Sequence, residues 1–200
     1  MKLNFVEKAL MNSRARAFVQ RRYEAPLLER LGGRVAGGRV LEVGCGRGVR
    51  TEIIFERFGA KEVHAFDIDE RMVMLARRRL ARYPREWLSL TVGDATAINE
   101  EAASFDAVFD FMIVHHVPEW QRAVAEIARV LRPGGRFFFE EVTRQALERW
   151  TYRTFFDHPK ENRFSGAEFI NELERRGIKV NGNSVERLSG DLVLGVGYRS

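Results

Sequence analysis

The chain has 200 residues, of which 45% are hydrophobic, and this suits one globular domain that can bury a sizeable core. Thirty-three Lys and Arg against 28 Asp and Glu give a formal charge of +5, which is typical of a solvated surface and would also suit an anionic membrane or nucleic acid. A single cysteine excludes an internal disulfide framework, and no run approaches the ~18 apolar residues of a membrane span. The N-terminus lacks the marks of a signal peptide, so we expect a cytoplasmic protein.

Residues 1–38 precede the first predicted strand. Their apolar residues recur at helical intervals with arginines between them, which predicts two helices with a break near Asn12-Ser13 or at Pro26. The simplest interpretation is that these helices pack on the main sheet. Two others are a lid over an active site and a basic amphipathic surface that touches a membrane.

From residue 39 onward, strand-like segments alternate with helix-like segments, the pattern of parallel βαβ units covered on both faces. The predicted strands cover residues 40–43, 62–67, 88–92, 105–114 and 136–142, and the predicted helices cover residues 49–58, 69–82, 119–131 and 165–176. Residues 178–188 and 191–198 alternate like the two strands of a hairpin. We therefore expect an α/β fold with a seven-stranded, mostly parallel sheet, helices on both faces and a C-terminal antiparallel hairpin.

The stretch 40–51 is a short apolar strand that breaks into glycines at every second position and then enters a helix. Gly44, Gly46 and Gly48 permit positive φ and carry no Cβ, so backbone N–H groups there can approach a nucleotide-like ligand closely. A dinucleotide-binding turn requires its third glycine where this chain has Val49. The spacing therefore disfavours a nicotinamide or flavin oxidoreductase.

The pattern E-x-G-x-G-x-G at residues 42–48, with Asp67 at the end of the next apolar run, resembles motif I of the class I S-adenosylmethionine-dependent methyltransferases. The strand series closed by a hairpin is similar to the Rossmann-like, seven-stranded fold of that family. The resemblance covers residues 39–200, which would form the S-adenosylmethionine-binding methyltransferase domain behind a helical lid or cap at 1–38. It implies S-adenosylmethionine as the cofactor. The sequence has no cluster of acidic residues after the fourth strand that would predict a metal site.

The resemblance implies a set of cofactor-binding residues at the carboxyl ends of the first four strands. They are Glu42, Gly44, Cys45, Gly46, Gly48, Asp67, Ile68, Met72, Asp94, Ala95, Asp110 and Phe111. Glu42 would help to hold the amino-acid moiety of the cofactor, or could be a carboxylate satisfied by nearby backbone N–H groups. The glycine turn would supply backbone surface against the methionine and ribose portions. Cys45 lies inside that turn, which disfavours a nucleophilic or metal-binding role.

The remaining members of the set would hold the nucleoside. Asp67 would accept hydrogen bonds from both ribose hydroxyls, which requires a carboxylate rather than an amide. Ile68 and Met72 would sandwich the adenine. Asp94 would accept from the exocyclic amine while the Ala95 N–H reaches a ring nitrogen. By itself Asp94 would be only a turn residue, but its place after the third strand of this series favours binding.

His115-His116 follows the fourth strand, where the methyl group would meet its acceptor. An imidazole with a pKa of about 6.5 could take a proton from a hydroxyl, an amine or a carbon acid. In the small-molecule subgroup that this chain resembles, such a pair often packs beside the cofactor without acting as a base. Because the sulfonium already activates the methyl group, alignment alone can supply most of the rate, and both interpretations stay open.

The pattern F-D-A-V…H-H-V, followed by L-R-P-G-G, is similar to the subgroup that includes the ubiquinone and menaquinone C-methyltransferases and many small-molecule O- and N-methyltransferases. A cluster of aromatic residues and the basic N-terminus would suit a small lipophilic acceptor and peripheral membrane contact. The cluster consists of Trp150, Tyr152, Phe155 and Phe156. An RNA methyltransferase is a second interpretation, disfavoured because the chain lacks a Pro-Pro-aromatic motif after strand four and has no spare cysteine. A third is a subunit that binds cofactor and a protein partner without turnover.

Overall fold

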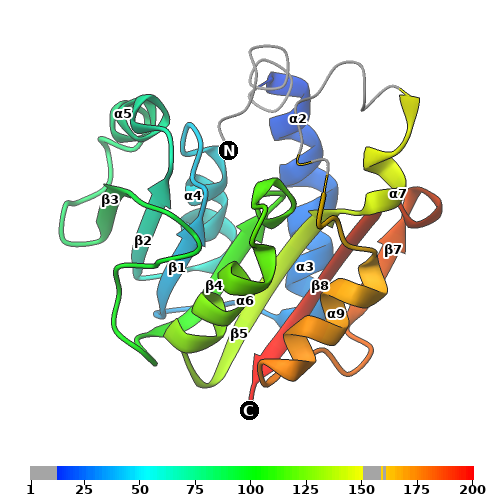
Figure 1. Ribbon diagram of the computed structural model, residues 1–200. Helices are drawn as coiled ribbons and strands as arrows, with labels where there is room; N and C mark the ends of the chain where they lie inside the picture. The colour runs from blue at the N-terminus through cyan, green and yellow to red at the C-terminus, as the bar shows by residue number, and fades with distance from the viewer. Residues whose placement is uncertain (1–12, 151–158, 160) are drawn as a thin grey trace.

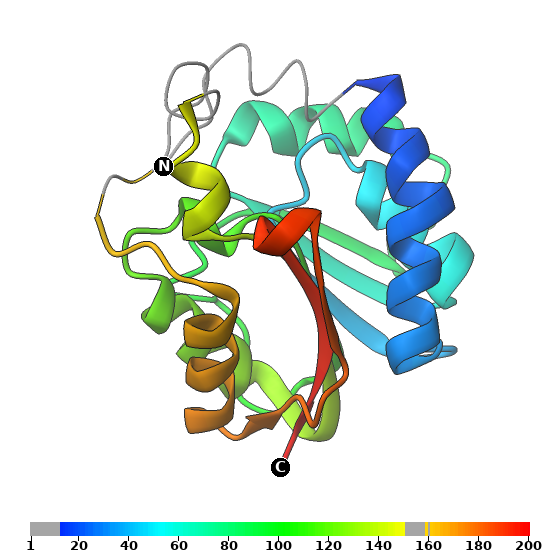
Figure 2. The ribbon, with the colours of Figure 1, turned by 90° about the vertical axis from the view of Figure 1, so that its right-hand side faces the viewer.

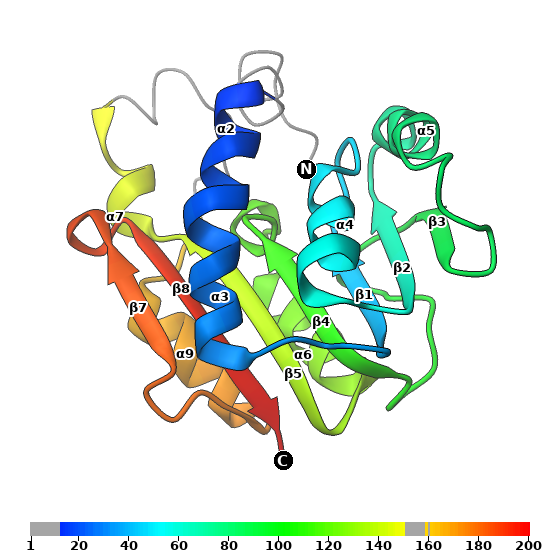
Figure 3. The ribbon, with the colours of Figure 1, turned by 180° about the vertical axis from the view of Figure 1, so that it is seen from behind.

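The computed structural model describes residues 13–150, 159 and 161–200, and these form three layers, with a central sheet between two layers of helices (Figure 2). Helices α6 and α9 cover one face, while α2, α3 and α4 cover the other (Figures 1 and 3). The helical elements are α2 (Arg14–Val19), η1 (Gln20–Glu24), α3 (Ala25–Gly32), α4 (Val49–Ile53), η2 (Ile54–Phe58), α5 (Glu70–Arg79), η3 (Val114–His116), α6 (Trp120–Val130), α7 (Arg144–Leu147), α9 (Gly166–Arg175) and η4 (Leu188–Gly190). No helix in the described ranges is long and apolar enough to cross a membrane.

The strands form one eight-stranded sheet in the order β3-β2-β1-β4-β5-β8-β6, and β7 also pairs with β8. They are β1 (Arg39–Val43), β2 (Glu62–Asp67), β3 (Leu88–Val92), β4 (Phe105–Phe111), β5 (Leu131–Val142), β6 (Ile178–Lys179), β7 (Ser184–Arg187) and β8 (Leu192–Arg199). The first five strands run parallel, and β8 runs antiparallel to its neighbours. The predicted fold class is confirmed. Because the strand order reverses between β1 and β4, the carboxyl ends of these strands flank a crevice that suits a ligand.

Three predicted strands differ from the structure by more than one residue. The strand predicted over 136–142 begins earlier, at Leu131, where a helix end was predicted. The strand predicted over 178–188 is broken into β6 and β7, because Asn181 and Gly182 adopt positive φ angles of 51° and 77° between them. The sheet therefore has eight strands and not seven. The strand predicted over 105–114 ends at Phe111, because Met112 has a φ of 64° and the chain then turns into a 3-10 helix. Residues 112–114 are apolar, like the strand before them, but their backbone is not extended.

The described part of the N-terminal segment is one continuous helical run through α2, η1 and α3. It begins after Ser13, whose side chain accepts a hydrogen bond from the Arg16 N–H, so the predicted break near Ser13 coincides with a helix start. Residues 1–12 lie outside the described residues. The break predicted at Pro26 is wrong. Proline has no N–H and clashes with the carbonyl four residues earlier, and the wider π-helical turn of η1 directly before α3 accommodates both effects.

Two predicted helix starts are confirmed. Asp69 caps α5 by accepting a hydrogen bond from the Arg71 N–H at 3.1 Å. Ser165 and Glu168 form a reciprocal capping box at the start of α9. These caps satisfy N–H groups that have no partner inside the helix, and their sequence signature is local, so it could be identified without the fold.

Phenylalanines of β4 and β5 form the core between the sheet and the N-terminal helix. Phe109 and Phe138 stack with ring centroids 4.4 Å apart, and Phe58 packs edge-on against both. Each ring is fully buried, which contributes roughly 1.5–3 kcal/mol apiece. Gly32, at the end of α3, lies against this layer so closely that a Cβ there would come within 2.6 Å of Phe138. The N-terminal helix is thus docked on the same core as the parallel strands.

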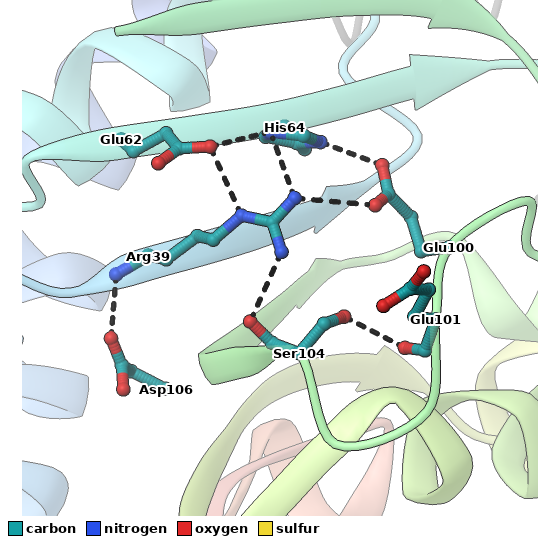
Figure 4. A network of polar contacts seen from close by, with 7 residues as sticks. All are labelled: Arg39, Glu62, His64, Glu100, Glu101, Ser104 and Asp106. Carbon is teal, nitrogen blue, oxygen red and sulfur yellow. Dashed lines mark hydrogen bonds and ion pairs between the residues drawn. The ribbon is translucent and has the colours of Figure 1, made fainter.

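A charged network joins the amino ends of β1 and β2 to the loop before β4 (Figure 4). Arg39 donates from Nε to Glu62 at 3.0 Å, and its guanidinium lies 4.7 Å from the centre of the Phe105 ring. The two ring nitrogens of His64 lie 2.7 Å from Glu62 and 2.6 Å from Glu100. The network therefore fastens the end of the sheet opposite to the carboxyl ends of the strands.

Replacing Arg39 by methionine should lower the free energy of unfolding by about 1–2 kcal/mol, because it removes charge-assisted hydrogen bonds while keeping the apolar stem. Lysine at this position keeps the charge but not the forked donors, so R39K should lie between R39M and the wild type. Urea denaturation measures the difference. Equal stabilities for R39M and the wild type would contradict a structural role for the network.

Candidate functional site

A cavity opens at the carboxyl ends of β1, β2 and β4 and reaches the turns that follow β3 and β4. The structure brings most of the predicted site residues to its wall. These are Gly44, Cys45, Gly46, Asp67, Ile68, Met72, Asp94, Ala95 and His116. The other five predicted site residues are buried and do not line the cavity. They are Glu42, Gly48, Asp110, Phe111 and His115.

The three glycines of the turn after β1 serve different purposes. A Cβ on Gly44 would lie 2.5 Å from the Ile113 side chain, and a Cβ on Gly48 would lie 2.9 Å from Leu80, so both make room for protein atoms. Gly46 has a φ of 52°, and a Cβ there would meet no protein atom within 4 Å. Of the three, Gly46 alone is both open and on the cavity wall. Burial raises the pKa of the Cys45 thiol, which keeps it protonated and agrees with the expectation that it is no nucleophile.

Asp67 is fixed at the end of β2 by the backbone around it. Its Oδ2 accepts from the Gly46 N–H at 2.9 Å, and its Oδ1 accepts from the Asp69 N–H at 2.9 Å. The first bond joins the turn after β1 to the end of β2, so the carboxylate and the glycine turn form one rigid unit. Ile68 and Met72 follow on the same wall. Asp67 is half-buried and keeps access to the cavity.

The turn after β3 supplies the other side of the cavity. Asp94 accepts from the Thr96 N–H at 2.8 Å and from the Thr96 hydroxyl at 2.9 Å, both through Oδ1. Ala95 beside it is buried. The cavity therefore combines two carboxylates from neighbouring strands with apolar side chains and a Cβ-free turn. That set of groups fits a nucleoside that carries a ribose diol and a flat base.

Glu42 lies fully buried under the glycine turn. Its Oε2 accepts from the Thr51 hydroxyl at 2.5 Å, while its Oε1 has no partner among the described residues. Burial raises the pKa of Glu42 to about 7. The local partner of this carboxylate is thus a hydroxyl on α4, not the backbone N–H groups considered from the sequence.

The raised pKa of Glu42 means that protonation favours the folded state, so this contribution to stability is lost as pH rises through the folded pKa of about 7. The free energy of unfolding of the wild type should fall as pH rises from about 5 to about 8. E42Q removes the titration and keeps an acceptor for Thr51, so its fall over the same range should be shallower. Urea denaturation at a series of pH values measures both curves, and parallel curves would contradict the prediction.

The second buried polar cluster holds the turn after β4. Glu141 of β5 accepts from the Val114 N–H at 2.7 Å and from the His115 N–H at 3.1 Å, and its Oε2 lies 2.5 Å from the His115 Nδ1. Burial lowers the pKa of His115 to about 3 and raises that of Glu141 to about 7. Asp110 accepts from the Ile113 N–H at 3.1 Å, and burial together with Glu141 raises its pKa well above the usual range. His115 and Asp110 are therefore part of the support for the wall.

Several residues on the wall were not predicted, and two of them, Gln20 of η1 and Arg50 of α4, are polar and buried. Both are almost fully buried, and the Arg50 guanidinium lies 5.8 Å from the centre of the Phe111 ring. A local signal for Arg50 exists, because it falls on the same helical face as the buried Ile53 and Ile54. An arginine on an otherwise apolar face requires a partner or a ligand.

Comparison with known proteins adds to this geometry. Residues 41–139 match the family described as "Methyltransferase domain". Residues 41–139 of the chain carry a methyltransferase domain. This match, together with the relatives described next, confirms the predicted methyltransferase family and its cofactor, S-adenosylmethionine. The methyltransferase domain spans β1 through most of β5, so it contains the glycine turn and the ends of the strands that surround the cavity.

Relatives of this methyltransferase domain come from both sequence and structure. The chain is 37% identical over 162 residues to a "Probable S-adenosylmethionine-dependent methyltransferase" of Mycolicibacterium smegmatis, covering 80% of this chain and 59% of the relative. It is 31% identical to a "Fatty-acid O-methyltransferase" of the same organism, covering 76% of this chain and 54% of the relative. A chain of the solved "Complex between the Haloferax volcanii Trm112 methyltransferase activator and the putative methyltransferase" has a TM-score of 0.74 at 21% identity, covering 96% of this chain and 97% of that one. This chain thus spans less than two thirds of the curated relatives' length.

Proposed function

We propose that this chain transfers the methyl group of S-adenosylmethionine to a small, lipophilic acceptor by in-line displacement. The observation that carries the proposal is the meeting of Gly46, Asp67 and Asp94 on the wall of one cavity. These three groups come from the ends of three neighbouring parallel strands, and Asp67 and Gly46 are joined by a hydrogen bond. When bound, the cofactor supplies an electrophilic methyl group on a sulfonium, so the chain has to bind, align and exclude water.

Each wall residue has a role in that binding. Asp67 accepts from the ribose hydroxyls, and its own backbone bonds hold it in one orientation. Ile68 and Met72 provide apolar surface for the adenine, while Asp94 and the Ala95 N–H form hydrogen bonds with the edge of its ring. Gly46 leaves the room into which the ligand extends. Glu42 helps to hold α4 in position through its hydrogen bond with Thr51. Glu141 holds the turn that carries the histidines by accepting a hydrogen bond from the backbone there.

The two histidines take different roles in this proposal. His116 lies on the cavity wall, whereas His115 is directed to Glu141 behind it. If His116 takes the acceptor proton, H116A should lower the single-turnover rate constant of methyl transfer by at least about 10-fold and remove the acidic limb of its pH profile. An unchanged rate with an unchanged profile would make His116 a wall residue only. H115A should instead lower stability, because it removes a partner of the buried Glu141.

Large exposed apolar side chains support a lipophilic acceptor. Phe18 and Tyr23 of the N-terminal helix and Trp150 beyond α7 are 57%, 65% and 73% exposed. α2 and α7 both lie at the edge of the sheet where the strands have their carboxyl ends (Figure 1). Of the aromatic cluster predicted near Trp150, the members at 152, 155 and 156 lie outside the described residues. The fatty-acid O-methyltransferase of Mycolicibacterium smegmatis, a relative of this chain, supports the same chemistry. Peripheral membrane contact and a cytoplasmic location belong to this proposal.

The test is a transfer screen with S-adenosylmethionine labelled in its methyl group. The purified chain is incubated with lipid extract, small metabolites or RNA of the host, after calorimetry has established cofactor binding. Label in the lipid fraction would support the proposal, and label in RNA would support a nucleic-acid methyltransferase instead. Cofactor binding without transfer to any fraction, together with a stably co-purifying protein, would support a non-catalytic subunit.

A further inference from the structure

The helical run over the cavity carries an unusual inner face. Arg16, Gln20 and Glu24 follow one another at intervals of four residues, so they lie on the same side of the helix. Arg16 forms ion pairs with Glu24 and, at 2.8 Å, with the fully buried Glu140 of β5. Further along the same run, the inner positions are apolar, as Leu28 shows. The helix therefore changes from polar to apolar where it passes from the cavity onto the core.

Arg50 is a second cation of this layer, and within the described part of the chain it forms no ion pair with a carboxylate. The residue is 9% exposed and lines the cavity. With the Gln20 amide oriented so that its oxygen faces Arg50, that oxygen accepts from Nε at 2.5 Å and from Nη2 at 3.1 Å. Among the described residues, no carboxylate forms an ion pair with Arg50, since Glu140 pairs with Arg16 and Glu42 bonds to Thr51.

A buried guanidinium without an anion is costly, because the charge has left water and one amide oxygen replaces little of its hydration. Burial, and to a smaller extent the nearby Arg16, lower the pKa of Arg50, while the more distant charges of Glu140, Glu42 and Glu24 raise it without forming an ion pair with it. Gln20 engages Nε and one terminal nitrogen, so part of the forked donor set stays available on the cavity side. A planar carboxylate matches such a fork.

We propose that Arg50, oriented by Gln20, is the carboxylate-recognition residue of this cavity. The carboxylate has two chemical sources, the α-carboxylate of the cofactor's amino-acid portion and an acid group on the acceptor. The inference rests on the proposed function, because it takes the cavity to be the cofactor site. In the first case Arg50 fixes the end of the cofactor that lies beyond the ribose, and in the second it selects acidic acceptors.

Calorimetry with matched ligands tests the proposal. S-adenosylhomocysteine carries the carboxylate, its decarboxylated analogue S-adenosyl-3-thiopropylamine does not, and methylthioadenosine lacks the whole amino-acid portion. If the cofactor is the source, the wild type should bind S-adenosylhomocysteine about 10- to 100-fold more tightly than the decarboxylated analogue, and R50M should lose this preference. R50K keeps the charge without the forked donors, so its preference for S-adenosylhomocysteine should fall between those of the wild type and R50M. Q20L should weaken the same preference, because Gln20 positions Arg50.

The second arm uses protein saturated with methylthioadenosine and titrated with octanoate or octanol. If the acceptor is the source, the wild type should prefer octanoate, R50M should not, and the preference for S-adenosylhomocysteine should be the same in both proteins. R47M is the matched control, since Arg47 lies on the same wall but is exposed. Loss of carboxylate preference in R47M, or its retention in R50M in both arms, would overturn the proposal.

Methylthioadenosine separates failure of this inference from failure of the proposed function. Its binding does not involve a carboxylate, so R50M and the wild type should bind it equally, and this also shows that R50M is folded. If the wild type bound neither methylthioadenosine nor S-adenosylhomocysteine, the proposed function itself would fail. If the wild type and every variant bound methylthioadenosine and S-adenosylhomocysteine with equal affinity, and none preferred octanoate to octanol, Arg50 would have no role in recognition.

Discussion

Replacing Asp67 by alanine should weaken the binding of S-adenosylhomocysteine at least about 100-fold. The carboxylate accepts from the Gly46 and Asp69 N–H groups and, in the proposed function, from both ribose hydroxyls. A lost hydrogen bond to a charged group costs about 1.5–3 kcal/mol, and two such losses exceed the ~2.7 kcal/mol that corresponds to 100-fold. Isothermal titration calorimetry measures the affinity directly.

The alanine variant could also bind weakly because the glycine turn has lost its anchor. Paired ligands distinguish the two causes. The wild type should bind methylthioadenosine more tightly than its 2′-deoxy analogue, whereas D67A should bind the two equally, because the acceptor for that hydroxyl is gone. If D67A still preferred the ribose form by the wild-type factor, the ribose assignment would be refuted and Asp67 would be only an anchor of the turn.

Replacing Gly46 by valine should abolish cofactor binding while the protein stays folded. A Cβ at this position meets no protein atom within 4 Å and lies on the cavity wall, so the added side chain would occupy space that the ligand needs. The positive φ of 52° adds backbone strain of about 1–3 kcal/mol for a β-branched residue. Calorimetry should detect no binding, while thermal unfolding should show one cooperative transition at a moderately lower temperature.

Gly182 provides the matched control for backbone strain. It has a φ of 77°, a Cβ there also meets no protein atom within 4 Å, and it lies between β6 and β7, outside the cavity wall. G182V should therefore lose comparable stability and keep full affinity for S-adenosylhomocysteine. Equal loss of affinity in both variants would mean that strain alone explains the effect, and Gly46 would then not be a ligand contact.

The features that the sequence predicts correctly are set by residues that lie close together along the chain. The strands at 62–67 and 88–92 match the structure to the residue, because each is a short apolar run bounded by turn residues. The family resemblance implied that the glycine turn and Asp67 belong to one site, and parallel strands bring their carboxyl ends to one edge of the sheet. The Gly46–Asp67 hydrogen bond is the direct result of that rule.

Features that depend on distant partners could not be predicted in this way. Gln20 and Arg50 come together only when the N-terminal helix docks on the sheet, and no spacing in the sequence relates them. Glu141 stands at the end of an apolar strand, where nothing local shows that its carboxylate holds the turn after β4. Pro26 is tolerated because of a π-helical turn, which has no clear residue pattern.

The buried charges under the N-terminal helix also constrain how this protein can diverge. Arg16 is the cation shared by Glu24 and Glu140, and removing it leaves the buried Glu140 without its ion-pair partner, at a cost of about 3–5 kcal/mol. Such a cost approaches the whole stability of a typical domain. Substitutions in this layer are therefore expected to be accepted in compensating pairs during evolution. Sequences descended from this one should therefore show covariation of positions 16 and 140.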